Sequence, residues 1–251
     1  MEPIFEAVLA GGHRLARILK ADPGAVRIAA ARDELVDSIP HWLYVGDTAL
    51  HLASAALRLG AVKRLLQRGA DPNAKNRRQA TPLHYACDAR PNTTAPRSQA
   101  AQARLIEELV EAGADLNRAD AGGATPLHRA VRARSPAAVA QLLALGARTD
   151  GRLRLRNSTP LHLAAQPTGA SGTAGALEQQ LAIIRLLRDY RANDAATDST
   201  GRTPADWAND GRVLEAVTIM RCPVISPEHA RQATRARSRR GTSRRTGGCR
   251  R

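Results

Sequence analysis

The stretch TPLHYACD, residues 81–88, decides the fold, because its first half recurs along the chain. TPLH returns at Thr125 and Thr159, and relaxed copies occur as TALH at Thr48 and TPAD at Thr203. The steps between the five threonines are 33, 44, 34 and 44 residues. A motif that recurs at a period of about 20–50 residues predicts a repeat architecture, in which each copy begins one supersecondary unit.

Each copy of this word is followed by an apolar residue, two spacers, an apolar pair, and then Gly-Ala-Asp or a variant of it. The threonine can cap a helix by accepting a backbone amide, and the proline after it suits the first helical position. The apolar spacing predicts a second helix, which a left-handed glycine ends. The four second segments are VKRLLQRGADPN (62–73), LIEELVEAGADLN (105–117), VAQLLALGARTD (139–150) and IIRLLRDYRAND (183–194).

This combination resembles the ankyrin repeat, whose signature is TPLHxA followed by a helix that ends in GAD, over about residues 46–217. The resemblance implies an all-α solenoid of helix–turn–helix units joined by finger loops. One helical pair cannot bury its own apolar side, so neighbouring units must stack. The excess of arginine over lysine favours a bacterial source. We place the units at about 46–76, 77–120, 121–154, 155–198 and 199–220, within a repeat domain spanning 46–222.

Two segments flank the repeats. Residues 1–45 predict an N-terminal helical cap, with a helix–turn–helix followed by another amphipathic helix over 24–39. We expect Trp42 and Tyr44 to pack across the first finger. Residues 223–251 lack apolar periodicity, and residues 231–251 hold nine arginines and no acid. Such dense like charge predicts a disordered tail.

The uneven steps have one source. The motif threonine precedes the glycine position by 21 residues in units one and three, and by 32 in units two and four. The additional residues therefore lie between the two helices of the even units. We expect them to form loops on the rim opposite the fingers and to extend the second helix backwards. In unit four, Arg191 replaces the capping glycine and Arg188 takes an apolar slot.

The recurring histidines, His51, His84, His128 and His162, raise the question of a metal site. Each belongs to a different layer, whereas zinc needs three or four converging ligands. The family resemblance implies instead that each histidine satisfies backbone groups in a finger turn. No GxSxG elbow, GxGxxG motif or P-loop is present, so the sequence predicts no catalytic residue, cofactor or metal, and no enzyme.

Two of the four fingers are basic, those after units one and three. We expect a partner protein with an acidic binding segment, because arginine forks suit carboxylates. The alternative is a solvated surface in an arginine-rich protein. Tyr85, Arg129 and Leu163 occupy equivalent positions after the motif histidine and complete the predicted contact set. The candidate partner-binding residues are Tyr85, Arg129, Arg132, Leu163, Arg77, Arg78, Arg152, Arg154 and Arg156.

The function predicted is a non-catalytic protein–protein interaction scaffold; the alternative is a nucleic-acid-associated scaffold tethered by its tail. An arginine-rich arm binds phosphates without reading sequence, although a solvated terminus with no role is also compatible. No run of about 18 apolar residues predicts a membrane span. Three separated cysteines and no secretory pattern predict a monomeric cytoplasmic protein. The candidate nucleic-acid residues are Arg235, Arg237, Arg239, Arg240, Arg244 and Arg245.

Overall fold

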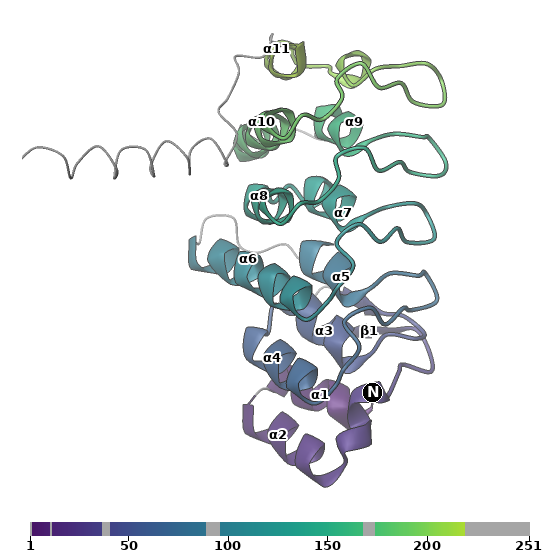
Figure 1. Ribbon diagram of the computed structural model, residues 1–251, viewed down its shortest axis with the longest axis vertical. Coiled ribbons are helices and arrows are strands. Elements are labelled where there is room, and N and C mark those ends of the chain that lie inside the picture. The colour runs from purple at the N-terminus through teal and green to yellow at the C-terminus, as the bar shows by residue number, and fades with distance from the viewer. Residues whose placement is uncertain (1, 11, 37–40, 89–95, 168–173, 219–251) are drawn as a thin grey trace, which may run out of the picture. The chain divides into compact units, whose positions relative to one another are not determined.

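Helical hairpins stack one on another throughout the computed structural model, which confirms the predicted all-α solenoid (Figure 1). The repeat helices are short, and each pair is followed by a loop that projects to the same side of the stack. The structure describes residues 2–10, 12–36, 41–88, 96–167 and 174–218. The repeat helices are α3 (Ala49–Ala55), α4 (Leu59–Gln67), α5 (Pro82–Asp88), α6 (Pro96–Glu111), α7 (Pro126–Arg132), α8 (Pro136–Ala144), α9 (Pro160–Ala165), α10 (Ala174–Asp189), η2 (Ala205–Trp207) and α11 (Gly211–Thr218).

The helices form two rows (Figure 1). Helices α3, α5, α7 and α9, here called the inner helices, contact one another in sequence beside the finger loops. Helices α4, α6, α8, α10 and α11 form the outer row in the same order. Every helix thus packs against its own partner and against its neighbours in the adjacent layers. None of the described helices has the length and apolar character to cross a membrane.

An additional layer precedes the first repeat. Helices α1 (Pro3–Ala10) and α2 (Gly12–Ala21) form the predicted helix–turn–helix, and they pack against α3 and α4 respectively. They supply Phe5, the largest of the fully buried side chains in the described part of the chain. This layer covers the apolar side of unit one, as a terminal cap must.

The prediction of an amphipathic helix over residues 24–39 is wrong. Residues Pro23–Arg27 form a single 3-10 helix, η1, and the chain then extends into β1 (Glu34–Val36), which pairs antiparallel with β2 (His41–Leu43). The backbone N–H of Ala30 donates to the Asp47 carbonyl at 2.7 Å, and the Gly46 N–H donates to the Ala30 carbonyl at 2.9 Å. These long-range backbone bonds outweigh the weak local helix preference.

The even units carry the longer second helices that the sequence predicts. Helices α6 and α10 each have 16 residues, whereas α4 and α8 each have nine. Buried Gln102 and Gln180 occupy equivalent places in the extensions, and each Nε2 donates at 2.8 Å to a carbonyl of the preceding inner helix, that of Ala86 or Ala164. The same bond recurring 78 residues apart supports duplication of a two-unit module, although the insert loops 89–95 and 168–173 lie outside the described residues.

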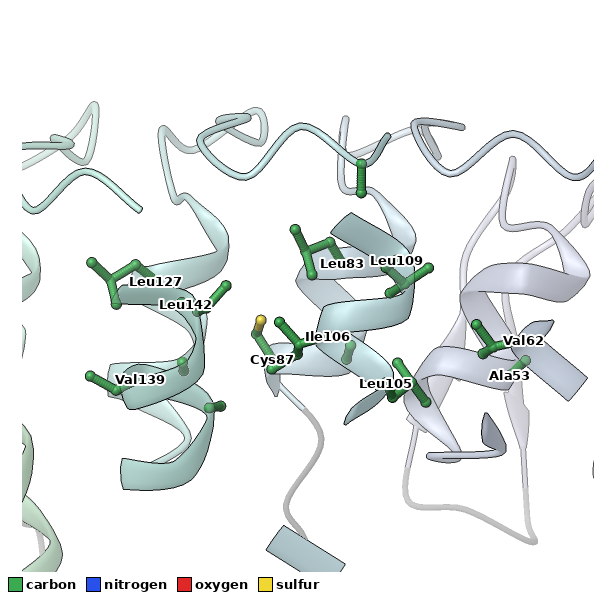
Figure 2. Packing of buried hydrophobic residues seen from close by; sticks show 14 of the residues in the cluster. Ala53, Val62, Leu83, Cys87, Leu105, Ile106, Leu109, Leu127, Val139 and Leu142 are labelled. Carbon is green, nitrogen blue, oxygen red and sulfur yellow. The ribbon is translucent and has the colours of Figure 1, made fainter. Parts of the chain in front are cut away.

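The core is a continuous seam of leucine, isoleucine, valine and alanine between the rows (Figure 2). In unit two, Leu83 of the inner helix and Leu105, Ile106 and Leu109 of the outer helix are all fully buried in this seam. Burying each such side chain contributes about 1.5–3 kcal/mol. Because the side chains are small and the inner helices short, the layers approach closely without large aromatic rings.

Three of the four second helices in the complete units end as predicted, with a glycine at positive φ: Gly69 (81°), Gly113 (93°) and Gly146 (96°). Arg191 stands at the fourth position and adopts the same conformation, with φ at 61°. A left-handed residue with a Cβ atom costs about 1–2 kcal/mol, so unit four carries local backbone strain.

Replacing Arg191 by glycine should raise the free energy of unfolding by about 0.5–1 kcal/mol, since relief of this strain exceeds the added freedom of the unfolded chain. Urea denaturation would measure the change. The matched reverse substitution, Gly146→Arg, should lower stability by a similar amount, because a Cβ at that glycine meets no atom within 4 Å and only the backbone conformation is penalised. An unchanged or lower stability for Arg191→Gly would contradict this account.

Candidate partner-binding site

The motif histidines join successive layers. His51 accepts the Thr48 backbone N–H on Nδ1 at 3.1 Å, and its Nε2 lies 3.1 Å from the carbonyl oxygen of Ala80, the residue before the next motif threonine. Accepting on Nδ1 leaves the proton on Nε2, which donates to that carbonyl. The same two bonds are made by His84 with Thr81 and Ala124, by His128 with Thr125 and Ser158, and by His162 with Thr159 and Arg202.

This geometry supports the structural reading of the histidines. Burial lowers the pKa of His84 to about 4 and that of His128 to about 4, and it also lowers the pKa of His162. A neutral ring is required, because one nitrogen must accept while the other donates. Within the described residues, no three His, Cys, Asp or Glu side chains converge as metal ligands would.

A second recurring arrangement of hydrogen bonds holds three of the four finger turns. The side-chain oxygen Oδ1 of Asn76 accepts the backbone N–H groups of Arg78 and Ala80 at 2.9 and 3.0 Å. Asp120 and Asp198 make the same turn in the second and fourth fingers. The other end of each side chain binds the residue four positions after the motif threonine: Asn76 Nδ2 donates to the Tyr85 hydroxyl (2.9 Å), and the carboxylates accept from Arg129 Nη2 (2.5 Å) and Trp207 Nε1 (3.0 Å).

This arrangement changes the interpretation of the three equivalent positions. Tyr85 is only 5% exposed, and its hydroxyl also donates to Asp47 at 2.6 Å, which corrects the expectation of an exposed contact residue. Burial, with Asp47 alongside, raises the pKa of Tyr85. Arg129 is held by both Asp120 and Asp88, and Leu163 is half-buried against the core. All three side chains therefore serve the scaffold first.

Four of the predicted residues nevertheless meet at one pocket. The pocket has a volume of about 230 Å³ and lies where strand β2, the first finger, α5 and α7 approach one another. Asp88 binds the guanidinium groups of Arg129 at 3.0 Å and Arg132 at 3.2 Å across the layers. We call this the hairpin pocket, after the antiparallel β1–β2 pair, here called the hairpin. The pocket is lined by Trp42, Tyr44, Asn76, Arg78, Ala80, Tyr85, Asp88, Arg129 and Arg132.

The arginines of the first finger lie close to the hairpin. Arg77 is paired with Asp33, and the Cζ atom of Arg78 lies 4.3 Å from the centre of the Tyr44 ring. The expected packing of Tyr44 across the first finger is thus present. Trp42 lines the same pocket but remains 50% exposed.

The third finger divides its arginines between two roles. Arg152 is exposed, but its Nη1 donates to the carbonyls of Asn157 (2.8 Å) and Thr197 (2.7 Å), so it ties this finger to the next. Arg156 approaches the Trp207 ring at 5.9 Å, and Arg154 is exposed. Between them stands Leu155, which is 88% exposed. The hairpin pocket does not include any residue of this finger.

Known families match two parts of this framework. The family described as "Ankyrin repeats (3 copies)" matches residues 98–178, and the family described as "Ankyrin repeat" matches residues 45–77. The described helices form an ankyrin-repeat solenoid. The structure continues the same ankyrin layers through residues 78–88 and 179–218, outside the matched segments.

Ankyrin repeats explain the scaffold, whereas the candidate contact residues lie at positions that vary between units. Sequence reasoning missed Asp88, which gathers two arginines, and Leu155, although an isolated leucine within RLRLRN was a visible signal. The unit boundaries remain predictions. The tail residues Arg235, Arg237, Arg239, Arg240, Arg244 and Arg245 lie outside the described residues.

The free energy of unfolding should fall as the pH is lowered from 7 to 5. The unfolded histidines take up protons near pH 6.5, whereas His84 and His128 remain neutral in the fold until about pH 4. Stability is therefore complete above pH 6.5 and is lost as the pH falls towards 4, by about 2 kcal/mol for each of these two residues at pH 5. Urea titrations at both pH values would measure it.

His128→Asn should flatten this pH dependence, while it lowers stability at pH 7 because two hydrogen bonds are lost. His13→Gln provides the matched control, since His13 is exposed on α2 and lies outside the repeats. Equal stability at pH 7 and 5, or loss of the pH dependence in the His13 variant, would refute the assignment.

A double-mutant cycle should detect the ion pair between Asp120 of the second finger and Arg129 of α7. Asp120→Asn retains the turn, as Asn76 does in the first finger, and Arg129→Leu introduces the residue that unit four carries at Leu163. We expect a coupling energy of about 1–2 kcal/mol between the two substitutions, measured by chemical denaturation. Asp115→Asn with Arg129→Leu should show no coupling, because Asp115 pairs with Arg118 instead. Additivity in the first cycle would mean that the finger is held by other contacts.

Proposed function

We propose that this protein is a non-catalytic scaffold that binds a protein partner on its finger loops and inner helices, here called the finger face. Ankyrin repeats generally mediate protein–protein interaction and are generally non-catalytic. The observation that carries the proposal is the hairpin pocket, which gathers side chains from three successive layers. Such a site exists only in the assembled stack, so a partner bound there contacts the solenoid as a unit.

The exposed side chains of the finger face suit recognition. Binding energy in protein interfaces concentrates in a few residues, with tryptophan and arginine enriched among them. Trp42 is half exposed beside Arg78 and Arg132, and Leu155 stands at the third finger between two arginines. An apolar side chain this exposed gains more from a partner than from water. These residues form two contact regions on one face of the stack.

The charge of the finger face favours an acidic partner segment. The hairpin pocket is lined by three arginines and one aspartate, a formal charge of +2, and finger three adds Arg154 and Arg156. A surface patch of one charge sign attracts partners of the opposite charge and disfavours partners of the same charge. Nucleic acid bound through residues 231–251 is the alternative, supported by the nine arginines of that segment.

Capture from a native lysate would test the proposal with full-length protein. Two variants alter the finger face: one replaces Arg154, Leu155 and Arg156 by serine, and the other replaces Trp42, Arg78 and Arg132. An outer-row control replaces the exposed Arg104 and Arg185, and a tail variant replaces the nine arginines of 231–251. We expect one or both finger-face variants to lose a bound protein by at least about tenfold, while the outer-row control and the tail variant retain it.

Recovery of the same proteins by wild type and both finger-face variants would overturn the proposal. Capture that requires the tail arginines, disappears after nuclease treatment and weakens steeply with salt would instead establish nucleic-acid tethering. Each variant should first show an unchanged unfolding transition, because the altered side chains are exposed or lie at the pocket wall.

A further inference from the structure

Among the three arginines that line the hairpin pocket, Arg78 has the fewest polar contacts. Within the described residues its guanidinium group makes no ion pair and no hydrogen bond. The group is nevertheless not randomly placed, because its Cζ atom stacks over the Tyr44 ring at 4.3 Å. Stacking fixes the plane of a guanidinium and leaves its N–H donors directed outward from the ring. Arg78 is thus a pre-positioned donor at the pocket wall.

The opposite wall already holds a carboxylate. Asp88 accepts from Arg129 Nη1 at 3.0 Å and from Arg132 Nη2 at 3.2 Å to each oxygen. The Nε and Nη1 groups of Arg132 make no hydrogen bond in the described part of the chain, and its side chain is 55% exposed. The protein's own aspartate therefore shows that the pocket arginines suit a carboxylate, and donors remain for a second one.

An apolar surface adjoins these donors. Leu35 and Trp42 are directly opposite in the two-stranded sheet, so they lie on the same face of the hairpin, and each is 50% exposed. Val45, just beyond β2, is also exposed. Trp42 belongs both to this surface and to the pocket lining. A bound segment would meet apolar contacts immediately beside the arginines.

We propose that the hairpin pocket binds a glutamate or aspartate side chain of a partner segment, between Arg78 and Arg132, with the segment's neighbouring apolar side chain on Trp42. This inference rests on the proposed function and specifies the chemistry of the partner. The net charge of the lining favours an anion, and the half-exposed indole favours an apolar neighbour.

A carboxylate suits this pocket better than a phosphate group. Both terminal nitrogens of Arg129 are already bonded, to Asp88 and Asp120, and its Nε is buried. Arg132 shares Asp88, so the donors that remain for a ligand are those of Arg78 and part of Arg132. When Asp120, the partner of Arg129, is counted with the lining, the cluster carries a net charge of +1, which a phosphate dianion beside Asp88 would exceed. A single negative charge with two oxygen acceptors matches the donors that remain.

Titration of full-length 15N-labelled protein with synthetic peptides would test the proposal. The probe alternates leucine and glutamate and is acetylated and amidated, so that its side chains hold its only carboxylates. Matched probes carry glutamine or phosphoserine in place of glutamate. The indole N–H signals report binding, because Trp42 lies at the pocket and Trp207, bonded to Asp198, serves as an internal reference.

We expect the glutamate peptide to shift the Trp42 signal saturably and to leave the Trp207 signal in place. The glutamine peptide should bind about tenfold more weakly. Arg78→Gln and Arg132→Gln should each weaken binding of the glutamate peptide several-fold, without affecting the glutamine peptide. Arg104→Gln removes the same charge from an exposed position of the outer row and should leave both affinities unchanged.

Four results would overturn the proposal: no Trp42 shift at millimolar peptide, equal affinity for the glutamate and glutamine peptides, no effect of either pocket substitution, or tighter binding of the phosphoserine peptide. The lysate capture separates this failure from failure of the proposed function. If the Trp42, Arg78 and Arg132 replacements abolish capture while the glutamate peptide does not bind, the surface stands and its carboxylate chemistry falls. If the glutamate peptide binds but neither finger-face variant loses a protein, the pocket binds carboxylates and the proposed partner surface is wrong.

Discussion

The hydrogen bond from each motif histidine to the backbone of the next finger is the contact on which the stack depends. It joins a buried ring in one layer to the carbonyl that precedes the following threonine, as from His84 to Ala124 at 2.9 Å. Since the ring is buried, a missing partner would leave a desolvated polar group. Each layer therefore requires its successor, and the short inner helices gain from stacking an order that their length alone could not provide.

The position after the histidine shows how this scaffold tolerates variation. Tyr85, Arg129 and Trp207 are chemically different, yet each binds the polar residue of the finger turn that precedes it in the chain. Unit four has Leu163 there, and its finger is held by Arg152, which bonds two carbonyls. The requirement is a held finger, not a particular side chain. Sequence variation can thus alter the finger face without loss of the fold.

The repeats could be predicted from the sequence because their signals are local: a threonine cap, a proline at the first turn, apolar spacing and a left-handed terminal residue. Even the substitution at Arg191 was located in this way, and it keeps the glycine conformation. The hairpin was not predicted, because β1 forms through pairing with β2, and Ala30 before it bonds to the distant Asp47 and Gly46. For the same reason, no sequence pattern placed Trp42 beside Arg132, which is far away along the chain.

The hairpin pocket distinguishes what duplication preserved from what it left to change. Seventy-eight residues on, Gln102 has its counterpart in Gln180, with the same bond to an inner helix. Arg78 has a counterpart in Arg156, but the other charged pocket residues have none: Asp88 corresponds to Gln166, Arg129 to Trp207 and Arg132 to Asp210. The second module also follows a repeat finger rather than the hairpin that carries Trp42 and Tyr44. Within the described residues, a site that combines repeated helices with one unrepeated hairpin occurs once, so it would give the proposed partner a fixed register on an otherwise periodic surface.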